Sequence, residues 1–128
     1  MAKANLLLCL EKRDLLNQSA VPIDKLVQWG ERYQEAGLVN DAVDFYERAN
    51  ASDALEGLLP LAFSDGDAFL YGRVLKALGR DGTPEEWVAL GDRAKALGKR
   101  AFALEAYRRG GLEVLSIEQQ GDGEEPST

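Results

Sequence analysis

One stretch of the chain repeats, and this repeat constrains the fold more than any other feature of the sequence. Residues 26–49 align with residues 87–110 without a gap, at a shift of 61 positions. The matched pairs are Val27 with Val88, Gly30 with Gly91, Arg32 with Arg93, Gly37 with Gly98, Ala42 with Ala103 and Tyr46 with Tyr107. Such a repeat predicts a helical hairpin that stacks on a neighbour, because a hairpin alone leaves one apolar face uncovered.

The repeated residue types have a common physical purpose. Small residues at Gly30 and Gly91 allow two helices to approach closely, and we expect Tyr46 and Tyr107 to fill the gap between hairpins. The glycines that follow the first helix of each copy favour the turn inside a hairpin. These residues therefore indicate packing and predict a fold rather than a chemistry.

Apolar residues recur at helical spacing along nearly the whole chain, and no alternating strand pattern persists. The sequence therefore predicts an all-α fold of about six to seven helices. Their expected positions are 4–17, from Pro22 to Gly37, about 42–49, from Ser52 or Asp53 as the cap to about Ala62, 68–78, from Thr83 to about Leu97, and 99–109. The sixth start is the clearest, since Thr83 can cap the helix, Pro84 suits the first turn and Glu86 completes a capping box. Pro60 leaves the bounds of the fourth helix open.

The repeated segments resemble the tetratricopeptide repeat family, whose unit is 34 residues long. One copy carries the family's pattern at Trp87, Leu90, Gly91, Ala103, Tyr107 and Gly110, and the other at Leu26, Gly30, Tyr33, Ala42, Tyr46 and Ala49. The resemblance implies a short α-solenoid of antiparallel helical hairpins. Because the shift of 61 is less than two family units, we expect the middle repeat, about 53–79, to be shortened by roughly two helical turns. The first helix is expected to cap the first hairpin.

Composition divides the chain into a folded part and a tail. We expect a repeat domain over residues 1–112 and an acidic, flexible tail over residues 113–128, which is too polar to bury a core. The apolar run near the N-terminus is short and is followed at once by charges, so we interpret it as mature sequence. With one cysteine and no span long enough for a bilayer, the expected location is the cytoplasm, without membrane insertion.

Catalytic residue patterns are scarce. The chain has no histidine, which removes the commonest general base and metal ligand. Cys9 lies in an apolar segment, so we expect a buried structural thiol rather than a nucleophile. The 64–67 turn lacks the spacing of a calcium loop. The net charge of −7 argues against nucleic-acid binding. We therefore expect no enzyme, no cofactor and no metal site.

Binding to another protein or peptide, including a second copy of the chain, is the expected role. The resemblance implies that the first helix of each hairpin lines a concave groove, with Val27, Glu31, Gln34, Glu35, Val88, Asp92 and Lys95 as its candidate residues. An acidic, partly apolar groove favours a basic or amphipathic peptide or helix. A basic patch is expected near the second copy, from Arg93, Lys99, Arg100, Arg108 and Arg109. It would dock an acidic partner or the acidic tail, unless these charges serve solubility alone.

Three functions are compatible with these features of the sequence. The first is a non-catalytic adaptor or scaffold that recruits a partner through its groove. The second is a small chaperone for a secreted or membrane client, by resemblance to bacterial secretion chaperones. The third is structural homo-oligomerisation, for which Trp87 or Phe102 would form the interface.

Overall fold

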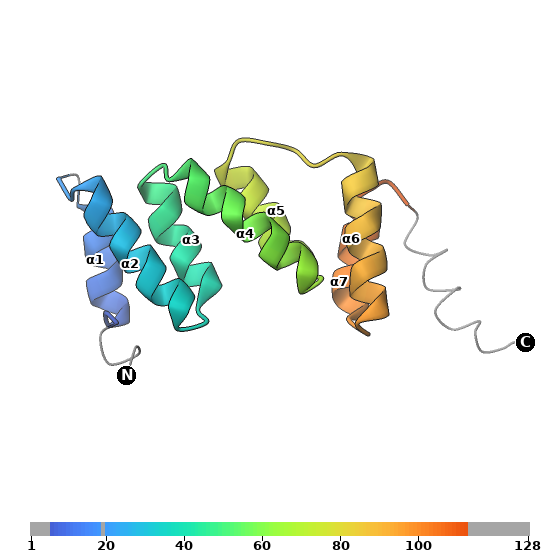
Figure 1. Ribbon diagram of the computed structural model, residues 1–128, viewed down its shortest axis with the longest axis horizontal. Helices are drawn as coiled ribbons and strands as arrows, with labels where there is room; N and C mark the ends of the chain where they lie inside the picture. The colour runs from blue at the N-terminus through green and yellow to red at the C-terminus, as the bar shows by residue number, and fades with distance from the viewer. Residues whose placement is uncertain (1–5, 19, 113–128) are drawn as a thin grey trace, which may run out of the picture. The chain divides into compact units, whose positions relative to one another are not determined.

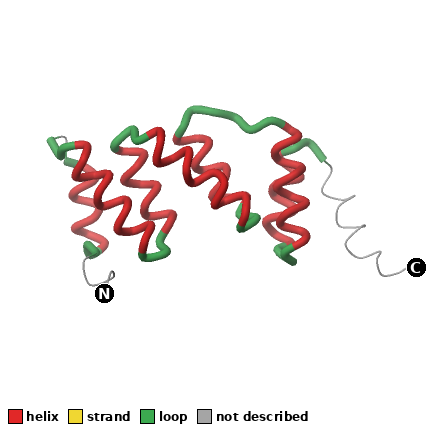
Figure 2. Tube along the Cα trace, in the orientation of Figure 1, coloured by secondary structure: helices red, strands yellow, loops and turns green. Residues whose placement is uncertain are grey.

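The computed structural model describes residues 6–18 and 20–112, and this part of the chain consists of helices, turns and loops without a strand (Figures 1 and 2). Its helices are α1 (Cys9–Asn17), α2 (Ile23–Glu35), α3 (Val39–Arg48), α4 (Ser52–Ser64), α5 (Ala68–Ala77), α6 (Pro84–Ala96) and α7 (Arg100–Arg109). The prediction of an all-α fold is confirmed. The predicted tail, 113–128, lies outside the described residues.

The middle hairpin is as long as the two that flank it. Helices α2, α4 and α6 each have 13 residues, and helices α3, α5 and α7 each have 10. The predicted shortening of the middle repeat is therefore wrong. The shift of 61 consists of one step of 29 residues from Ile23 to Ser52 and one of 32 residues from Ser52 to Pro84. The second step is longer because six residues, 78–83, connect α5 to α6, whereas three residues, 49–51, connect α3 to α4.

Each helix from α2 to α7 ends in the same left-handed turn. In the order of the helices, the residues with positive φ are Gly37, Asn50, Gly66, Gly79, Gly98 and Gly111. In the first of these turns, the Leu38 N–H donates to the Tyr33 carbonyl at 2.9 Å and the Gly37 N–H to the Gln34 carbonyl at 3.0 Å. This Schellman pattern satisfies carbonyls that a helix end leaves open, and glycine adopts it without a Cβ clash.

The first helix differs from its prediction. It begins at Cys9 rather than near residue 4, and Leu6 and Leu7 precede it as half-buried, non-helical residues. The prediction that Cys9 is buried is wrong, because its side chain is exposed at the start of the helix. Leu10 is also 63% exposed, since α1 packs through the face that carries Lys12 and Leu15 instead.

Helix α4 continues through Pro60 to Ser64, so the proline does not end it. A proline inside a helix lacks the N–H for one backbone hydrogen bond, and this position is exposed to solvent. Ser52 and Asp53, the expected caps, lie inside the first turn of α4. The cap at this helix was therefore predicted one or two residues too late.

The contacts divide the chain into two compact units, Met1–Gly57 and Leu58–Thr128. The core of the first unit comes from α2, α3 and the start of α4, with Leu26, Tyr33, Val43, Phe45, Tyr46 and Leu55 buried. The core of the second comes from α4 to α7, with Leu58, Tyr71, Val74, Trp87, Leu90 and Tyr107 buried. The predicted single domain over residues 1–112 stays a prediction.

Each repeated glycine is covered by the tyrosine of its own hairpin. A Cβ on Gly30 would lie 2.5 Å from Cε1 of Tyr46, and a Cβ on Gly91 would lie 2.7 Å from Cε1 of Tyr107. The predicted close approach is confirmed. The tyrosines, however, fill a gap inside the hairpin, whereas we expected them between hairpins.

Candidate functional site

Helix α6 holds a shallow depression that contains two of the predicted groove residues. Pro84, Glu85, Val88, Ala89 and Asp92 line it, with a volume of about 370 Å³. Each of these positions lies three or four residues from another of them along the helix, so they share one face. The depression therefore combines an apolar floor with two carboxylates, and it offers no imidazole, thiol or hydroxyl group.

The start of α6 is fixed by the capping box that the sequence predicts. The Thr83 hydroxyl accepts a hydrogen bond from the Glu86 N–H at 3.1 Å, and the Thr83 N–H donates to Oε1 of Glu86 at 2.8 Å. Pro84 occupies the first turn, where its missing N–H leaves no bond unmade. This cap sets the register of the helix and with it the positions of Glu85 and Asp92.

Asp92 is held in place by the repeated tyrosine of its hairpin. The hydroxyl of Tyr107 donates to Oδ1 of Asp92 at 2.5 Å. Burial of the ring, followed by this bond to a carboxylate, raises the pKa of Tyr107 to about 12. This bond therefore fixes the orientation of the Asp92 carboxylate, although Asp92 as a whole is exposed to solvent.

The corresponding residues of the first unit surround the other repeated tyrosine. The Tyr46 hydroxyl donates to Oε1 of Gln34 at 2.7 Å. Burial raises the pKa of Tyr46, and the negative charges of Glu31 and Glu35 raise it further. Together with half-buried Val27, these α2 residues form an acidic face within the first unit. Lys95 on α6 is exposed and does not line the depression.

Most cations of the predicted basic patch are engaged within the second unit. Nε of Arg93 donates to the Ser64 carbonyl at 2.9 Å, and Nζ of Lys99 donates to the Asp65 carbonyl at 2.7 Å. Positive charge at these carbonyls stabilises the C-terminal end of α4. These two cations therefore fix the turn that follows α4, a role that the charge count alone did not reveal.

The two arginines at the end of α7 share one carboxylate. Nη2 of Arg108 lies 2.7 Å from Oε2 of Glu105, and Nε of Arg109 lies 2.6 Å from the same atom. The hydrogen bond from Arg108 is the main reason that the pKa of Glu105 is lowered. Arg100, the remaining member of the patch, is exposed at the start of α7.

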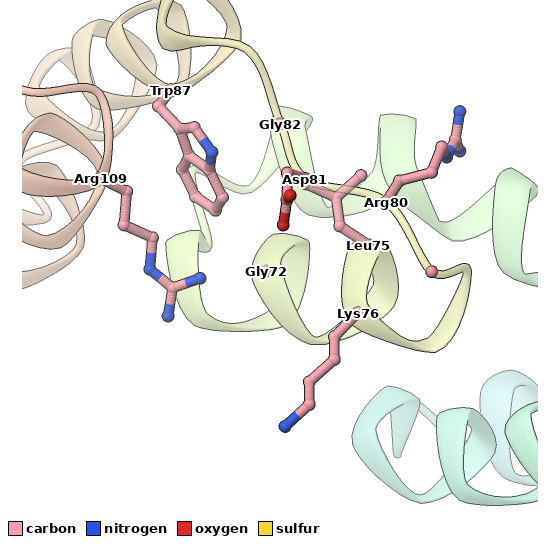
Figure 3. Close-up of a pocket in the computed structure, with 9 residues that line it drawn as sticks. Gly72, Leu75, Lys76, Arg80, Asp81, Gly82, Trp87 and Arg109 are labelled. Atoms are coloured by element: carbon pink, nitrogen blue, oxygen red, sulfur yellow. The ribbon is translucent and has the colours of Figure 1, made fainter.

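A second, larger cavity lies beside α5 and was not predicted. It has a volume of about 580 Å³ and is lined by Gly72, Leu75, Lys76, the connection 79–82, Trp87 and Arg109 (Figure 3). In Figure 3 the Asp81 carboxylate points toward α5, whereas the Arg80 side chain points away. The wall therefore presents charges of both signs, and this mixture singles out no ligand class.

Two glycines make room for the aromatic and cationic walls of this cavity. The Arg109 guanidinium lies over the Trp87 ring, 4.9 Å from its centroid, and contacts the backbone at Gly72, where a Cβ would clash with Nη1. A Cβ on Gly82 would lie 2.6 Å from Nε1 of Trp87. In the sequence, Gly72 and Gly82 are the signal for this cavity. Each lies where a side chain would collide with Arg109 or Trp87.

The described residues contain no group of three or more Asp, Glu, Cys or His side chains placed to hold a metal ion. None of the described helices is both long enough and apolar enough to cross a bilayer. A comparison of the chain with protein-family models, curated proteins and solved structures found no match.

Proposed function

We propose that the chain is a non-catalytic protein-interaction module, a short tetratricopeptide-like solenoid of helical hairpins that binds a basic or amphipathic peptide or helix. The observation that supports this function is the depression on α6. It joins the carboxylates of Glu85 and Asp92 to the apolar surface of Val88 and its neighbours. A lysine or arginine flanked by apolar residues is complementary to such a surface.

The equal hairpins support the repeat architecture within this proposal. Three hairpins have the same helix lengths, and the left-handed residues Gly66 and Gly79 are separated by the same interval as Gly98 and Gly111. Recruitment would proceed through a surface formed before binding, because the Tyr107 hydroxyl already orients Asp92. Pre-organised side chains reduce the entropy that association costs.

The test is a selection of random peptides displayed on phage against the whole chain, followed by fluorescence anisotropy with synthetic peptides. We expect the enriched sequences to carry Lys or Arg beside apolar residues. The variant Glu85→Gln with Asp92→Asn should weaken their binding about 2- to 30-fold, since an ion pair at an exposed carboxylate contributes about 0.2–1 kcal/mol and the variant removes two of them. Asp14→Asn with Asp65→Asn is the matched control, because it removes two exposed carboxylates that do not line the depression.

Selection of acidic peptides, or unchanged affinity in the double variant, would overturn the assignment of this surface. Far-UV circular dichroism establishes that the double variant keeps its helices, so a loss of binding can be assigned to the charges. Asn at position 92 can still accept the Tyr107 hydrogen bond through its carbonyl oxygen, which is the reason for choosing it.

Self-association is a second candidate, and one observation favours it. Phe69 is 51% exposed and packs edge-on against Phe102, with ring centroids 5.7 Å apart. Trp87, the other residue expected at a dimer interface, is only 6% exposed and so offers little surface to a second copy. Light scattering over a range of concentrations tests this candidate, and a mass that Phe69→Ser does not change would exclude this pair as the interface.

A further inference from the structure

Helix α1 is attached to the first unit by polar contacts of Lys12 and of its C-terminal end, beside the half-buried side chains of Leu15 and Leu16. None of its residues is buried, and only nine residues form it. An isolated helix of this length is marginal in water, because its nucleation cost is not recovered by so few hydrogen bonds. Helix α1 is therefore helical because of the surface on which it lies.

The centre of that surface is a socket for one lysine. Nζ of Lys12 lies 2.6 Å from Oδ1 of Asp41 and 2.6 Å from Oδ2 of Asp44. The same nitrogen lies 5.8 Å and 5.9 Å from the ring centroids of Tyr33 and Phe45. The two rings stack on each other with centroids 5.3 Å apart, so the socket has an aromatic floor and carboxylate walls.

The chemistry of the socket selects an ammonium group. Asp41 and Asp44 are three residues apart and so project from the same face of α3. A cation gains from both carboxylates and from the negative faces of the rings. Burial lowers the pKa of Lys12, but the hydrogen bonds to the two aspartates outweigh it, and the pKa lies above its ordinary value. Lys12 thus stays charged in the socket, with 15% of its side chain exposed.

The two ends of α1 are held through backbone carbonyls. The Tyr33 hydroxyl donates to the Leu7 carbonyl at 3.2 Å. Arg48 donates from Nε to the Leu16 carbonyl and from Nη2 to the Gln18 carbonyl, both at 2.8 Å. Helix α1 has no basic residue in its own last turn, so Arg48 supplies the positive charge that a helix C-terminus favours. Such contacts do not depend on the side chains of the bound helix.

We propose that the surface of α2 and α3 beneath α1 is a docking site for a short helix of a partner protein that carries a lysine followed three and four residues later by leucines. Helix α1 occupies this site within the chain, with Lys12 in the socket and half-buried Leu15 and Leu16 beside it. The site recognises the lysine, the leucine pair and the end of a helix. A partner helix binds by displacing α1. This surface shares no residue with the α6 depression, so its test is independent of the test of peptide binding at that depression.

The test uses the whole chain with Lys12→Glu, which places a third negative charge at the socket and releases α1. The probe is a fluorescein-labelled peptide of residues 6–18 with Cys9→Ser. We expect this variant to bind the peptide at least about 10-fold more tightly than the unmodified chain, in which α1 competes at an effective concentration in the millimolar range. Arg13→Glu is the matched control: it makes the same charge change on an exposed neighbour and should leave the socket occupied.

Two further variants assign the binding to the socket. A probe peptide that itself carries Lys12→Glu should not bind the released chain, and adding Asp41→Asn with Asp44→Asn to that chain should abolish binding of the original probe. The proposal would be overturned if the unmodified chain, the Lys12→Glu chain and the chain with the two added aspartate changes bound the original probe equally. Equal binding of both peptides to the Lys12→Glu chain would overturn it as well. Either result would show that general charge or apolar attraction is sufficient for binding.

If Lys12→Glu disturbs the folding of α2 and α3, hydrogen exchange in the unmodified chain tests whether α1 detaches from this surface. A detachable α1 requires its amides to exchange at least about 10-fold faster than those of α3, since local opening precedes global unfolding. Equal protection of α1 and α3 would show that they unfold as one unit, and it would contradict a displaceable helix.

Discussion

The contact of Tyr107 with Gly91 gives the sharpest test of the repeated hairpin. A Cβ at position 91 would lie 2.7 Å from Cδ1 and Cε1 of the tyrosine ring, a distance that forces a movement. The ring cannot swing out, because only 4% of Tyr107 is exposed and its hydroxyl is bonded to Asp92. We therefore expect Gly91→Ala to strain the packing of α6 against α7.

The size of the effect follows from two opposing terms. Replacing glycine by alanine inside a helix is favourable by about 1 kcal/mol when space is open. Overpacking a filled core is unfavourable by about 1–3 kcal/mol, and a ring held on two sides places this site toward the upper part of that range. The expected net effect is a loss of about 1–2 kcal/mol in the free energy of unfolding.

Urea unfolding followed by circular dichroism measures this loss. Gly57→Ala is the matched control, since Gly57 lies in α4 and no atom lies within 4 Å of the place that a Cβ would occupy there, and we expect it to gain about 0.5–1 kcal/mol. In a Tyr107→Leu background the cost of Gly91→Ala should disappear, because the clashing ring is gone. Equal stability of Gly91→Ala and Gly57→Ala would refute the steric reasoning.

Two further predictions concern the hydroxyl groups of the second unit. Tyr107 should titrate with a pKa of about 12, against an ordinary value of 10.0, because burial and the bond to Asp92 favour the neutral phenol. The absorbance of the phenolate measures this pKa. The variant Asp92→Ala should bring the pKa of Tyr107 closer to 10.0. Since the pKa is higher in the folded chain, the stabilisation from this group is complete below pH 10.0 and is lost as the pH rises through about 12, which urea unfolding across that range would detect. Thr83→Ala should cost about 1 kcal/mol of stability in the same assay, whereas Thr83→Ser should cost far less, because serine keeps the capping oxygen.

Short-range patterns in the sequence were sufficient to locate four of the helices. Apolar spacing located α2 and α5 to α7, and the Thr83 capping box fixed the start of α6, because each depends on residues within four positions of one another. The repeated glycine and tyrosine positions also predicted a close helix approach. Val88 and Asp92 were expected to line a binding surface, and the structure places both in one depression.

The middle hairpin shows where the sequence was misleading. Leu59 and Leu75 stand where the flanking hairpins have the glycine and the tyrosine, so this copy does not align by residue type. Its left-handed turns at Gly66 and Gly79 were the available signal, and Asn50 takes the same role in the first hairpin. Asparagine tolerates positive φ better than most residues. Because asparagine rather than glycine stands at position 50, the glycines alone do not show the regular spacing of these turns.

What the sequence by itself determined is the helical class of the fold, the positions of α2 and α5 to α7, the cap of α6, the turns at glycine, and the acidic character of the surfaces that α2 and α6 present. Only the tertiary structure decided which charges remain available, since Arg93 and Lys99 are bound to carbonyls at the end of α4 and Lys12 lies between two aspartates from α3. Those partners are 29 to 34 positions away along the chain. Helical periodicity is a local property, whereas the pairing of charges depends on how helices pack, and no short-range pattern encodes that.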